Sequence, residues 1–402
     1  MTSLPTLPDL RVAVVHDWLY TYAGAERVLE QFLTLFPQAE VFTLINFLPP
    51  GETAFLQGRP VHTSFLQKMP GVRRNHRPYL PLMPVAVEQF DLSGFDLVLS
   101  SSYAVAKGAI TGPDQKHVSY VHSPARYAWD LQHFYLRQSN LTSGPRAWFA
   151  RQMLHYIRMW DARTANGVDA FLANSQFIAR RIWKTYRRPA QVIYPPVDTA
   201  RFQLSADKDD YYFTASRMVP YKKIDLIVEA FSRMPDKRLV VVGDGPEMPK
   251  VRAKAGLNVH LLGYQPTDVL VRHMQHARAF VFAAEEDFGI LPVEAQACGT
   301  PVIAFGKGGV LESVRGLTSD RPTGAFFPQQ TVEDLIDAVR AFEAERDRIV
   351  PAVCRENALR FNPQRFRREI AEAVAQALED RSEPFQQPRP GEAEGWPRAV
   401  QG

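Results

Sequence analysis

Two carboxylates, Glu286 and Glu294, are separated by seven residues in a segment with the pattern of a strand, a loop and a helix. Residues 279–284 form a short apolar run typical of a buried parallel strand, and Pro292 suits the first turn of a helix that ends near Gly299. Glu286 is therefore expected in the loop at the carboxyl end of the strand, and Glu294 in the first helical turn. Ligands of open α/β sheets bind at this edge.

The loop between the two glutamates has features that suit an anion. Gly289 lets the backbone approach a ligand closely, and the N–H groups near Ile290 and Leu291 begin a helix whose dipole favours negative charge. A nucleotide sugar presents a diphosphate between two hydroxyl-rich sugars, and carboxylates accept hydrogen bonds from hydroxyls. These residues therefore predict a nucleotide-sugar site. The simpler interpretation is that Glu294 only favours the helix dipole and that Glu286 is a solvated loop residue.

Basic residues follow another expected strand, at 211–215. Arg217 and Lys222 lie in the loop after this strand, again at the edge where ligands bind. An arginine can bind phosphate oxygens with two nitrogens, whereas a lysine acts as a compact charge. Two such cations could stabilise the negative charge that develops on a leaving diphosphate. Lys223 is the alternative to Lys222 for this role.

Further candidate residues also follow expected strands. His122 comes directly after the strand at 117–121, at the ligand edge of the first domain, where it could face a cleft. Gly24 lies in the loop after the strand at 10–16 and would permit a close approach to a ligand. Gly243 follows a strand of the second domain and has either the same role or that of a plain turn residue.

Strand and helix patterns alternate along the chain, which predicts parallel sheets. The expected strands are at 10–16, 39–44, 97–100, 117–121 and 170–174, and then at 211–215, 238–242, 259–262, 279–284 and 302–305. Ser175 suits the N-cap of the helix that follows the fifth strand, and Pro195 and Pro196 stop regular structure at the end of the first domain. We expect an α/β protein with Rossmann-like domains at 1–198 and 199–363.

The composition fits two globular domains. The 402 residues are 46% hydrophobic and 22% charged, and a tail at 381–402, rich in Pro, Glu, Gln and Gly, is expected to be disordered. Cys298 and Cys354 are too few and too far apart for a disulfide framework or a zinc site. The absence of an apolar run of about 18 residues predicts a cytoplasmic protein with at most peripheral membrane contact. The net charge of +4 is too small to indicate nucleic-acid binding by itself.

With Phe288, Gly289, Ala295 and Gly299 in place, the E-x7-E segment resembles the retaining GT-B glycosyltransferases of family 4. The resemblance extends over nearly the whole chain. The segments HDWL, AGAER, YVHSPARYAWD and SRMVPYKKIDL resemble those of mannosyltransferases of bacterial O-antigen and exopolysaccharide synthesis. This implies two Rossmann-like domains that face each other across a cleft, with a helix at 364–380 that crosses back to the first domain.

The resemblance also implies a role for each candidate residue. Glu286 would hold hydroxyls of the transferred sugar, and Glu294 the ribose of the nucleotide. Arg217 and Lys222 would clamp the diphosphate, and His122 would lie near the transferred sugar. The nucleotide-sugar site would further include Gly24, Gly243, Phe288, Gly289 and Ile290. In the loop of Gly24, Ala23 replaces the first of two glycines that relatives often have. The reaction would retain the anomeric configuration, and the leaving phosphate would accept the proton of the acceptor.

The donor implied by the resemblance is GDP-mannose, with UDP-hexoses or other nucleoside diphosphate hexoses as the alternative, and the acceptor is a lipid-linked saccharide. No metal or other cofactor is expected, because the D-x-D spacing of Asp207 and Asp209 occurs in a polar linker. The segment from Lys68 to Pro84 combines basic with apolar residues. This pattern suits an anionic inner-membrane surface, although an ordinary surface loop explains it equally well. No nucleic-acid motif accompanies it.

Two other classes of protein use related folds. A sugar-nucleotide epimerase or dehydrogenase would need a G-x-G-x-x-G pattern in the first loop, which the sequence lacks. A non-catalytic partner subunit would be expected to lose Arg217, Lys222 or the glutamates, and all of these are present.

Overall fold

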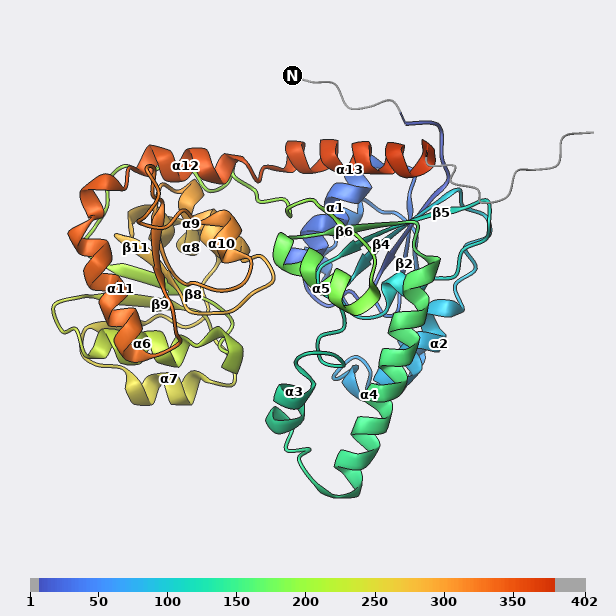
Figure 1. Cartoon of the computed structure of the whole chain (residues 1–402), viewed down its shortest axis with the longest axis horizontal. Helices are drawn as coiled ribbons and strands as arrows, with labels where there is room; N and C mark the ends of the chain where they lie inside the picture. The colour runs from blue at the N-terminus through green and yellow to red at the C-terminus, as the bar shows by residue number, and fades with distance from the viewer. Residues whose placement is uncertain (1–6, 380–402) are drawn as a thin grey trace, which may run out of the picture.

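The computed structural model describes residues 7–379, which form two α/β domains side by side (Figure 1). Within these residues the first sheet has the strand order β3-β2-β1-β4-β5-β6-β7, and the second has the order β10-β9-β8-β11-β12-β13. Neighbouring strands run parallel throughout. The strands are β1 Val12–His16, β2 Glu40–Thr43, β3 Val61–Thr63, β4 Leu97–Ser102, β5 Lys116–Val121, β6 Ala170–Ala173, β7 Gln191–Val192, β8 Tyr212–Ala215, β9 Leu239–Val242, β10 Val259–Leu261, β11 Ala279–Phe282, β12 Val302–Phe305 and β13 Gly324–Phe327. The predicted α/β fold with two Rossmann-like domains is confirmed.

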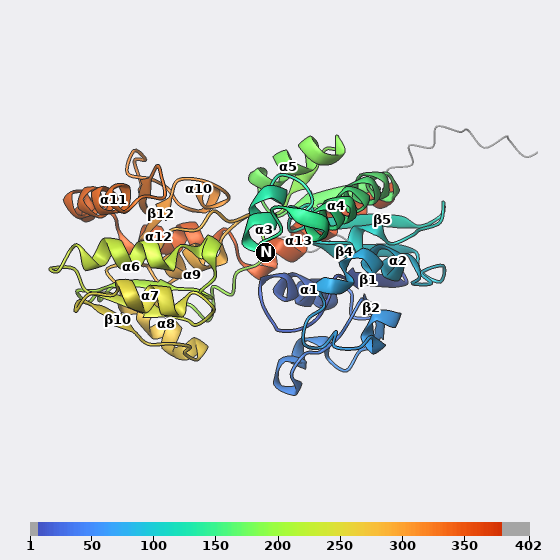
Figure 2. The same ribbon diagram turned by 90° about the horizontal axis from the view of Figure 1, so that it is seen from below.

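Helices cover both faces of each sheet, as Figure 2 shows from a second direction. The helices are α1 Gly24–Leu35, α2 Met83–Glu88, α3 Gln132–Gln138, α4 Gly144–Thr164, α5 Gln176–Tyr186, α6 Ile224–Ser232, α7 Met248–Lys254, α8 Thr267–His276, α9 Ile290–Ala297, α10 Val310–Ser313, α11 Val332–Ala344, α12 Pro351–Leu359 and α13 Pro363–Glu379. No helix among residues 7–379 is long and apolar enough to cross a membrane.

The strands are apolar at successive positions because both faces of each sheet are buried. In the second sheet, Tyr212 and Val241 belong to a core that includes residues of α6 and α11. Their neighbours Phe213 and Val240 belong to a second core, on the side of α8 and α9. Successive residues of a strand point to opposite faces, so one strand contributes to both cores.

Helix α13 lies against the first domain, although it follows the second domain in the sequence. Phe366 of α13 packs on Phe32 of α1 and on Tyr120 of β5, with ring centroids 6.1 and 5.6 Å apart. Figure 1 shows α12 and α13 running along one side of both domains. The tail at 381–402 lies outside the described residues.

The strand order reverses beside β1 in the first sheet and beside β8 in the second. In open α/β sheets such a reversal marks the place where ligands bind, outside the carboxyl ends of the strands. His16 and Val121 end β1 and β5, and Ala215 and Phe282 end β8 and β11. The loops that follow these strands carry the candidate residues predicted from the sequence.

Candidate active site

Lys222 and Glu286 meet at the carboxyl-end edge of the second sheet. Lys222 ends a short 3-10 helix, Pro220–Lys222, in the loop after β8, and Glu286 lies in the loop after β11. Their side chains form an ion pair and are only 15% and 20% exposed. Two loops that are 64 residues apart in the sequence therefore place a lysine and a carboxylate together, because β8 and β11 are neighbours in the sheet.

The charge of Lys222 is sensitive to its surroundings. Burial lowers the pKa of Lys222 to about 8, and the guanidinium of Arg126 acts in the same direction, while Asp287 opposes them. A second anion beside Lys222 would favour the charged form and raise this pKa. The site therefore has a cation that is stabilised further when a negatively charged ligand binds.

Arg217 is the second predicted cation of this edge. It lies two residues after β8 and its side chain is exposed. Arg217 is close enough to Tyr221 to act on the pKa of that phenol, in the direction that lowers it. Arg217 and Lys222 thus lie in the same short segment after β8, at the carboxyl-end edge of the sheet.

Glu294 is buried in α9 and forms an ion pair with Arg27 of the first domain. Arg27 Nη1 lies 2.5 Å from Glu294 Oε1. The loop of the first domain also touches α9 here, because a Cβ atom at Gly24 would lie 3.0 Å from Ile290 Cδ1. Arg27 belongs to the AGAER segment, but sequence reasoning assigned it no role. The signal was its position one helical turn after Gly24.

The loop between the two glutamates is held by its own packing. Gly289 has φ +87° and is the N-cap residue of α9, a conformation that favours glycine. The ring of Phe288 is buried between Tyr194 and Phe361, with centroids 5.7 and 5.3 Å away. A ligand would therefore contact the backbone at Phe288, since its ring fixes the loop from behind.

Glycines of the second domain allow its loops to pack closely. A Cβ atom at Gly243 would lie 1.9 Å from the carbonyl oxygen of Ser216, directly before Arg217. A Cβ atom at Gly308 would lie 2.5 Å from the carbonyl oxygen of Glu286. Contact between loops thus accounts for both glycines, and through it they position the backbone of Arg217 and Glu286.

His122 lies at the carboxyl end of β5 in the first domain. Its Nε2 atom is 2.9 Å from Ser101 Oγ, which is 3.0 Å from Nδ1 of the buried His16. Burial lowers the pKa of His122 to about 3, and His16 acts in the same direction. The imidazole is therefore neutral at physiological pH, and it can position a hydroxyl group by hydrogen bonding.

The HDWL segment has a structural role beside this histidine. Asp17 is buried and accepts four backbone hydrogen bonds, from Tyr103, Ala104, Val105 and Ala106, at 2.6 to 2.9 Å. These bonds hold the loop after β4 next to His16 and His122. A carboxylate that accepts several backbone N–H groups fixes a loop without help from secondary structure.

Asp287, directly after Glu286 in the loop that follows β11, joins the two domains, a role that was not predicted. Its carboxylate lies 3.3 Å from both Arg126 and Arg181 of the first domain. Its carbonyl oxygen accepts a hydrogen bond of 2.6 Å from Ser175, whose own Oγ accepts the N–H of Ile178 as the predicted N-cap. The acidic loop of the second domain thus contacts the first domain through Arg126, Arg181 and Ser175.

Glu312 of α10 makes a related contact. It accepts the backbone N–H groups of Gln176 and Phe177, at 2.7 and 2.9 Å, at the start of α5. A carboxylate at a helix N-terminus is favoured by unpaired N–H donors and by the helix dipole. Here the helix and the carboxylate belong to different domains, so the cap also holds the domains together.

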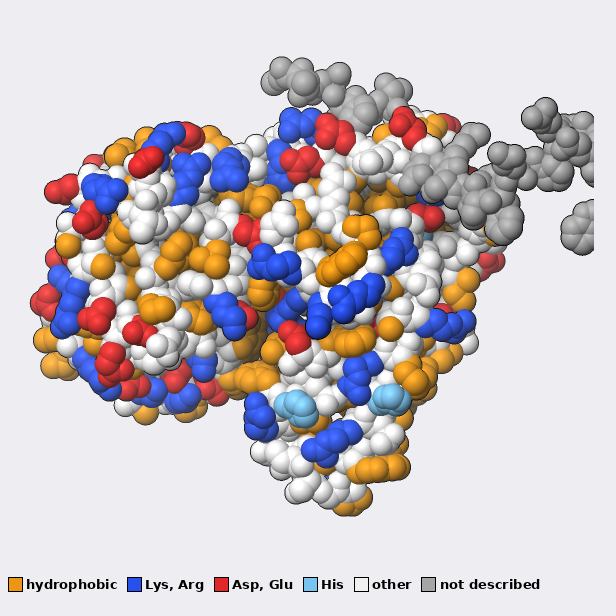
Figure 3. All heavy atoms as spheres, in the orientation of Figure 1, with side chains coloured by type: hydrophobic (Ala, Val, Ile, Leu, Met, Phe, Trp, Pro, Cys, Tyr) orange, Lys and Arg blue, Asp and Glu red, His pale blue; other side chains and the backbone are white. Residues whose placement is uncertain are grey.

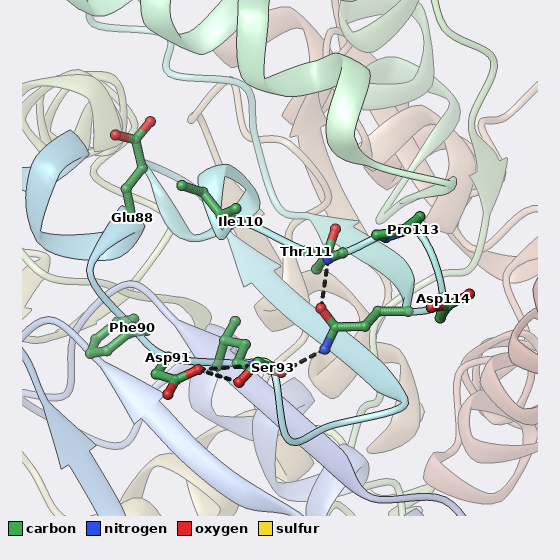
Figure 4. A pocket seen from close by; sticks show the side chains of 11 residues that line it. Glu88, Phe90, Asp91, Ser93, Ile110, Thr111, Pro113 and Asp114 are labelled. Carbon is green, nitrogen blue, oxygen red and sulfur yellow. Dashed lines mark hydrogen bonds between the residues drawn. The ribbon is translucent and has the colours of Figure 1, made fainter. Parts of the chain in front are cut away.

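Two other regions lie away from this edge. The pocket in Figure 4 lies among residues 88–93 and 110–115, which precede β4 and β5, so it is at the opposite edge of the first sheet. Its Gln115 and Ser93 are already hydrogen-bonded to the surrounding loops. Asp207 and Asp209 precede β8, on the edge of the second sheet that lies away from Glu286, and Lys208 between them binds Thr300 at 2.8 Å.

Both domains resemble known families of proteins. Residues 22–201 match the family model Glycosyltransferase Family 4, and residues 197–361 match the model Glycosyl transferases group 1. Over 151 residues the chain is 35% identical to a D-inositol 3-phosphate glycosyltransferase of Mycobacteroides abscessus, a match that covers 35% of this chain and 33% of that protein. It is 32% identical over 231 residues to a GDP-mannose-dependent alpha-(1-6)-phosphatidylinositol monomannoside mannosyltransferase of Mycobacterium tuberculosis, covering 49% of this chain and 58% of the relative. The matches therefore span between one third and three fifths of these relatives.

Solved structures share the fold over nearly the whole chain. HepE of Anabaena, in complex with UDP-glucose, superposes with a TM-score of 0.64 at 18% identity, covering 92% of this chain and all of that one. Sucrose-phosphate synthase of Thermosynechococcus elongatus has a TM-score of 0.67 at 18% identity, with coverages of 91% and 98%. The two domains of this chain are thus glycosyltransferase domains in the GT-B arrangement.

Proposed function

We propose that this protein is a retaining glycosyltransferase that transfers a hexose, mannose from GDP-mannose, to a lipid-linked saccharide in the synthesis of a bacterial surface polysaccharide. The observation that carries the proposal is the pairing of Lys222 with Glu286 beside the start of α9, with Arg217 exposed nearby. Cations, a helix N-terminus and a carboxylate at one edge suit a diphosphate that is joined to a sugar.

In this proposal the donor diphosphate binds between the N-terminus of α9 and the two cations. The diphosphate attracts Lys222 and weakens its pair with Glu286, which leaves the carboxylate free to accept hydrogen bonds from hydroxyls of the hexose. As the bond between the anomeric carbon and the diphosphate breaks, Arg217 and Lys222 stabilise the charge on the leaving group. The acceptor oxygen bonds to the anomeric carbon on the same face, and its proton passes to the leaving phosphate.

Glu294 and Arg27 hold the nucleoside side of the donor. The ribose hydroxyls replace Arg27 as partners of the Glu294 carboxylate, and the guanidinium is then available to the nearby phosphates. Gly24 keeps the first-domain loop close to α9, and the neutral His122 positions a hydroxyl of the transferred sugar. Both domains contribute to one site, as is common for ligands bound between domains.

The choice of donor is supported by resemblance. The HDWL and YVHSPARYAWD segments are similar to those of mannosyltransferases, and a relative with 32% identity is GDP-mannose-dependent by name. UDP-hexoses are the second candidate, because the structure of HepE with a similar fold contains UDP-glucose. No metal cofactor is part of the proposal, because Arg217 and Lys222 supply the positive charge.

A thermal-shift panel of GDP, UDP, ADP and their sugar conjugates tests the donor site. A ligand that binds only the native state at one hundred times its Kd stabilises it by about 2.7 kcal/mol. We expect GDP and GDP-mannose to raise Tm, with transfer from GDP-mannose measured afterwards on lipid-linked saccharides. A rise with UDP compounds alone would replace the donor, and no rise with any nucleotide would favour a non-catalytic partner subunit of the same fold.

A further inference from the structure

The helical hairpin at 132–164, formed by α3 and α4, presents large hydrophobic side chains to solvent. Trp148, Phe149 and Met159 of α4 are 63%, 57% and 55% exposed, and Phe134 of α3 is 37% exposed. Trp148 and Met159 are eleven residues apart, which is about three helical turns, so they share one face of α4. Isolated exposed hydrophobic residues are ordinary, but a group on one projecting element indicates a contact surface.

The surface charge of the hairpin is positive. Its basic residues are Arg137, Arg146, Arg151, Arg158 and Arg163. Its single acidic residue, Asp161, is fully buried and is bound by Lys107, Trp129 and Tyr186 at 3.0, 2.7 and 2.9 Å. A partner that approaches the hairpin therefore meets arginines and hydrophobic side chains, with no carboxylate of the hairpin between them.

The basic segment from Lys68 to Pro84 adjoins the hairpin. Leu80 packs against Ala128 and Ile157 at the base of α4. Lys68, Arg73, Arg74 and Arg77 are exposed. The two segments carry a formal charge of +8 and the whole chain carries +4, so the rest of the chain carries −4. In Figure 3, basic and hydrophobic side chains are intermingled over the part of the first domain that projects downward, where Figure 1 labels α3 and α4.

We propose that the hairpin docks this protein on an anionic membrane surface, with Trp148 and Phe149 in the lipid headgroup region and the arginines paired with lipid phosphates. Tryptophan favours this depth because its ring is amphipathic. Single-stranded nucleic acid also attracts arginine and aromatic side chains. The exposed Met159, Leu82 and Val85 offer it no stacking surface, whereas lipid chains accommodate them.

Docking through the hairpin would hold the candidate active site close to the membrane. Helix α3 begins ten residues after His122, and Arg126 in the intervening segment contacts Asp287 of the second domain. An acceptor attached to a lipid could then reach the cleft without leaving the bilayer. The docking itself follows from the surface of the hairpin and does not depend on the proposed reaction.

Sedimentation of the full chain with vesicles tests the proposal. The vesicles contain phosphatidylcholine with or without phosphatidylglycerol. We expect wild-type protein to sediment only with phosphatidylglycerol vesicles, and Trp148→Ser/Phe149→Ser to bind at least tenfold more weakly because the inserted side chains are lost. Arg146→Gln/Arg163→Gln should bind about fivefold more weakly for each arginine removed, with the effect shrinking at high salt.

Matched changes in the second domain serve as controls. Leu257→Ser and Arg340→Gln remove an exposed hydrophobic residue and an exposed arginine, and both variants should bind vesicles as wild type does. Circular dichroism melting checks the folding of each variant, and nucleotide binding is measured separately, so a failure of docking is distinguishable from a failure of the proposed reaction. Undiminished vesicle binding by the Trp148 and Phe149 variant, no wild-type binding to anionic vesicles, or tighter binding to a single-stranded oligonucleotide would each overturn the proposal.

Discussion

Lys222, which forms an ion pair with Glu286, is the group of the proposed site whose charge should depend most on pH. Burial lowers the pKa of Lys222 to about 8, so the lysine loses its charge at a pH where an ordinary lysine keeps it. The charged form binds a diphosphate, and kcat/KM should therefore fall about tenfold per pH unit above pH 8. Lys222→Arg should remove this fall, because a guanidinium stays charged. A level wild-type profile from pH 7 to 10 would contradict the assignment.

The lowered pKa of Lys222 also affects stability, and here the change with rising pH is opposite to that of kcat/KM. Its folded pKa is below its unfolded value, so between about pH 8 and the ordinary lysine pKa of 10.5 the unfolded chain binds more protons than the native state. The contribution of Lys222 to the free energy of unfolding should therefore increase with pH in this window. Activity that falls while this contribution rises would separate a charge effect on binding from alkaline unfolding.

Two adjacent lysines allow the diphosphate contact to be assigned. Lys222→Ala should lower kcat about 10²- to 10³-fold, because the stabilised charge develops in the transition state. Lys223→Ala is the matched control, because Lys223 is the alternative candidate and lies next in the loop, with φ +56°. It should change kcat less than threefold if Lys222, which pairs with Glu286, is the lysine that contacts the leaving group. Equal losses in the two variants, measured by steady-state transfer, would count against the pairing of Lys222 with the leaving group.

Glu294 allows a test of the nucleoside side. Glu294→Ala removes a carboxylate that is buried in α9 and should raise the Kd for the nucleotide about tenfold or more through lost hydrogen bonds to ribose. Glu285→Ala removes a nearby carboxylate that pairs with Lys307 and should leave the Kd nearly unchanged. Isothermal titration of both variants with the nucleoside diphosphate measures the difference. The interpretation fails if both titrate like wild type.

At the scale of elements, the loops after β8 and β9 depend on a glycine. A Cβ atom at Gly243 would lie 1.9 Å from Ser216 O, whereas a Cβ atom at Gly263, which also has positive φ, meets nothing within 4 Å. Gly243→Ala should therefore destabilise the protein by about 2 kcal/mol more than Gly263→Ala, which adds only backbone strain. Urea unfolding of the two variants gives the comparison, and equal losses of stability would show that the loops can separate without cost.

The sequence predicts many of the elements but misses the hairpin. Strands such as β1 and β11 are apolar at every position because they are buried on both faces, and this pattern is visible in the sequence. Helix α4 has apolar residues on its solvent face, including Trp148 and Met159, so its pattern does not separate a buried from an exposed side. A helix that also has apolar residues on its exposed face lacks the one-sided apolar pattern by which surface helices are recognised.

The same limit applies to the candidate site. Lys222 and Glu286 could be selected because each follows a strand, and the order of strands in a parallel sheet then brings their loops together. Asp287 lies in the same loop as Glu286, and Arg27 lies one helical turn after Gly24, so both are near predicted residues. Their ion pairs could not be predicted, because the partners lie in the other domain. Contacts between domains depend on how two finished domains meet, and no local pattern encodes that.

At the scale of the whole molecule, the structure shows the domains in contact at the site. Arg27 with Glu294, and Arg126 and Arg181 with Asp287, join the first domain to the acidic loop and to α9. A donor that replaces some of these partners would shift the balance between contacting and separated domains. The donor can shift this balance only to the extent that it binds contacting domains and separated domains with different affinity.

The contact between Glu312 and α5 provides the clearest test of the balance between contacting and separated domains. Glu312 is not among the residues proposed to contact the donor, and it accepts two N–H groups of α5, at Gln176 and Phe177. Glu312→Ala removes both bonds and should favour separated domains, with a larger radius of gyration in small-angle scattering and a higher Kd for the donor. Hydrogen bonds to a charged group contribute about 1.5–3 kcal/mol each, enough to shift the population more than tenfold.

Glu333→Ala is the matched control for this experiment, because Glu333 pairs with Arg233 within the second domain. It should leave the radius of gyration unchanged. Saturating nucleotide should return Glu312→Ala toward the wild-type radius if the donor binds both domains, since binding then favours the arrangement in which they meet. A radius that is equal in wild type and Glu312→Ala would show that α12 and α13, which run along both domains, are sufficient to hold them together.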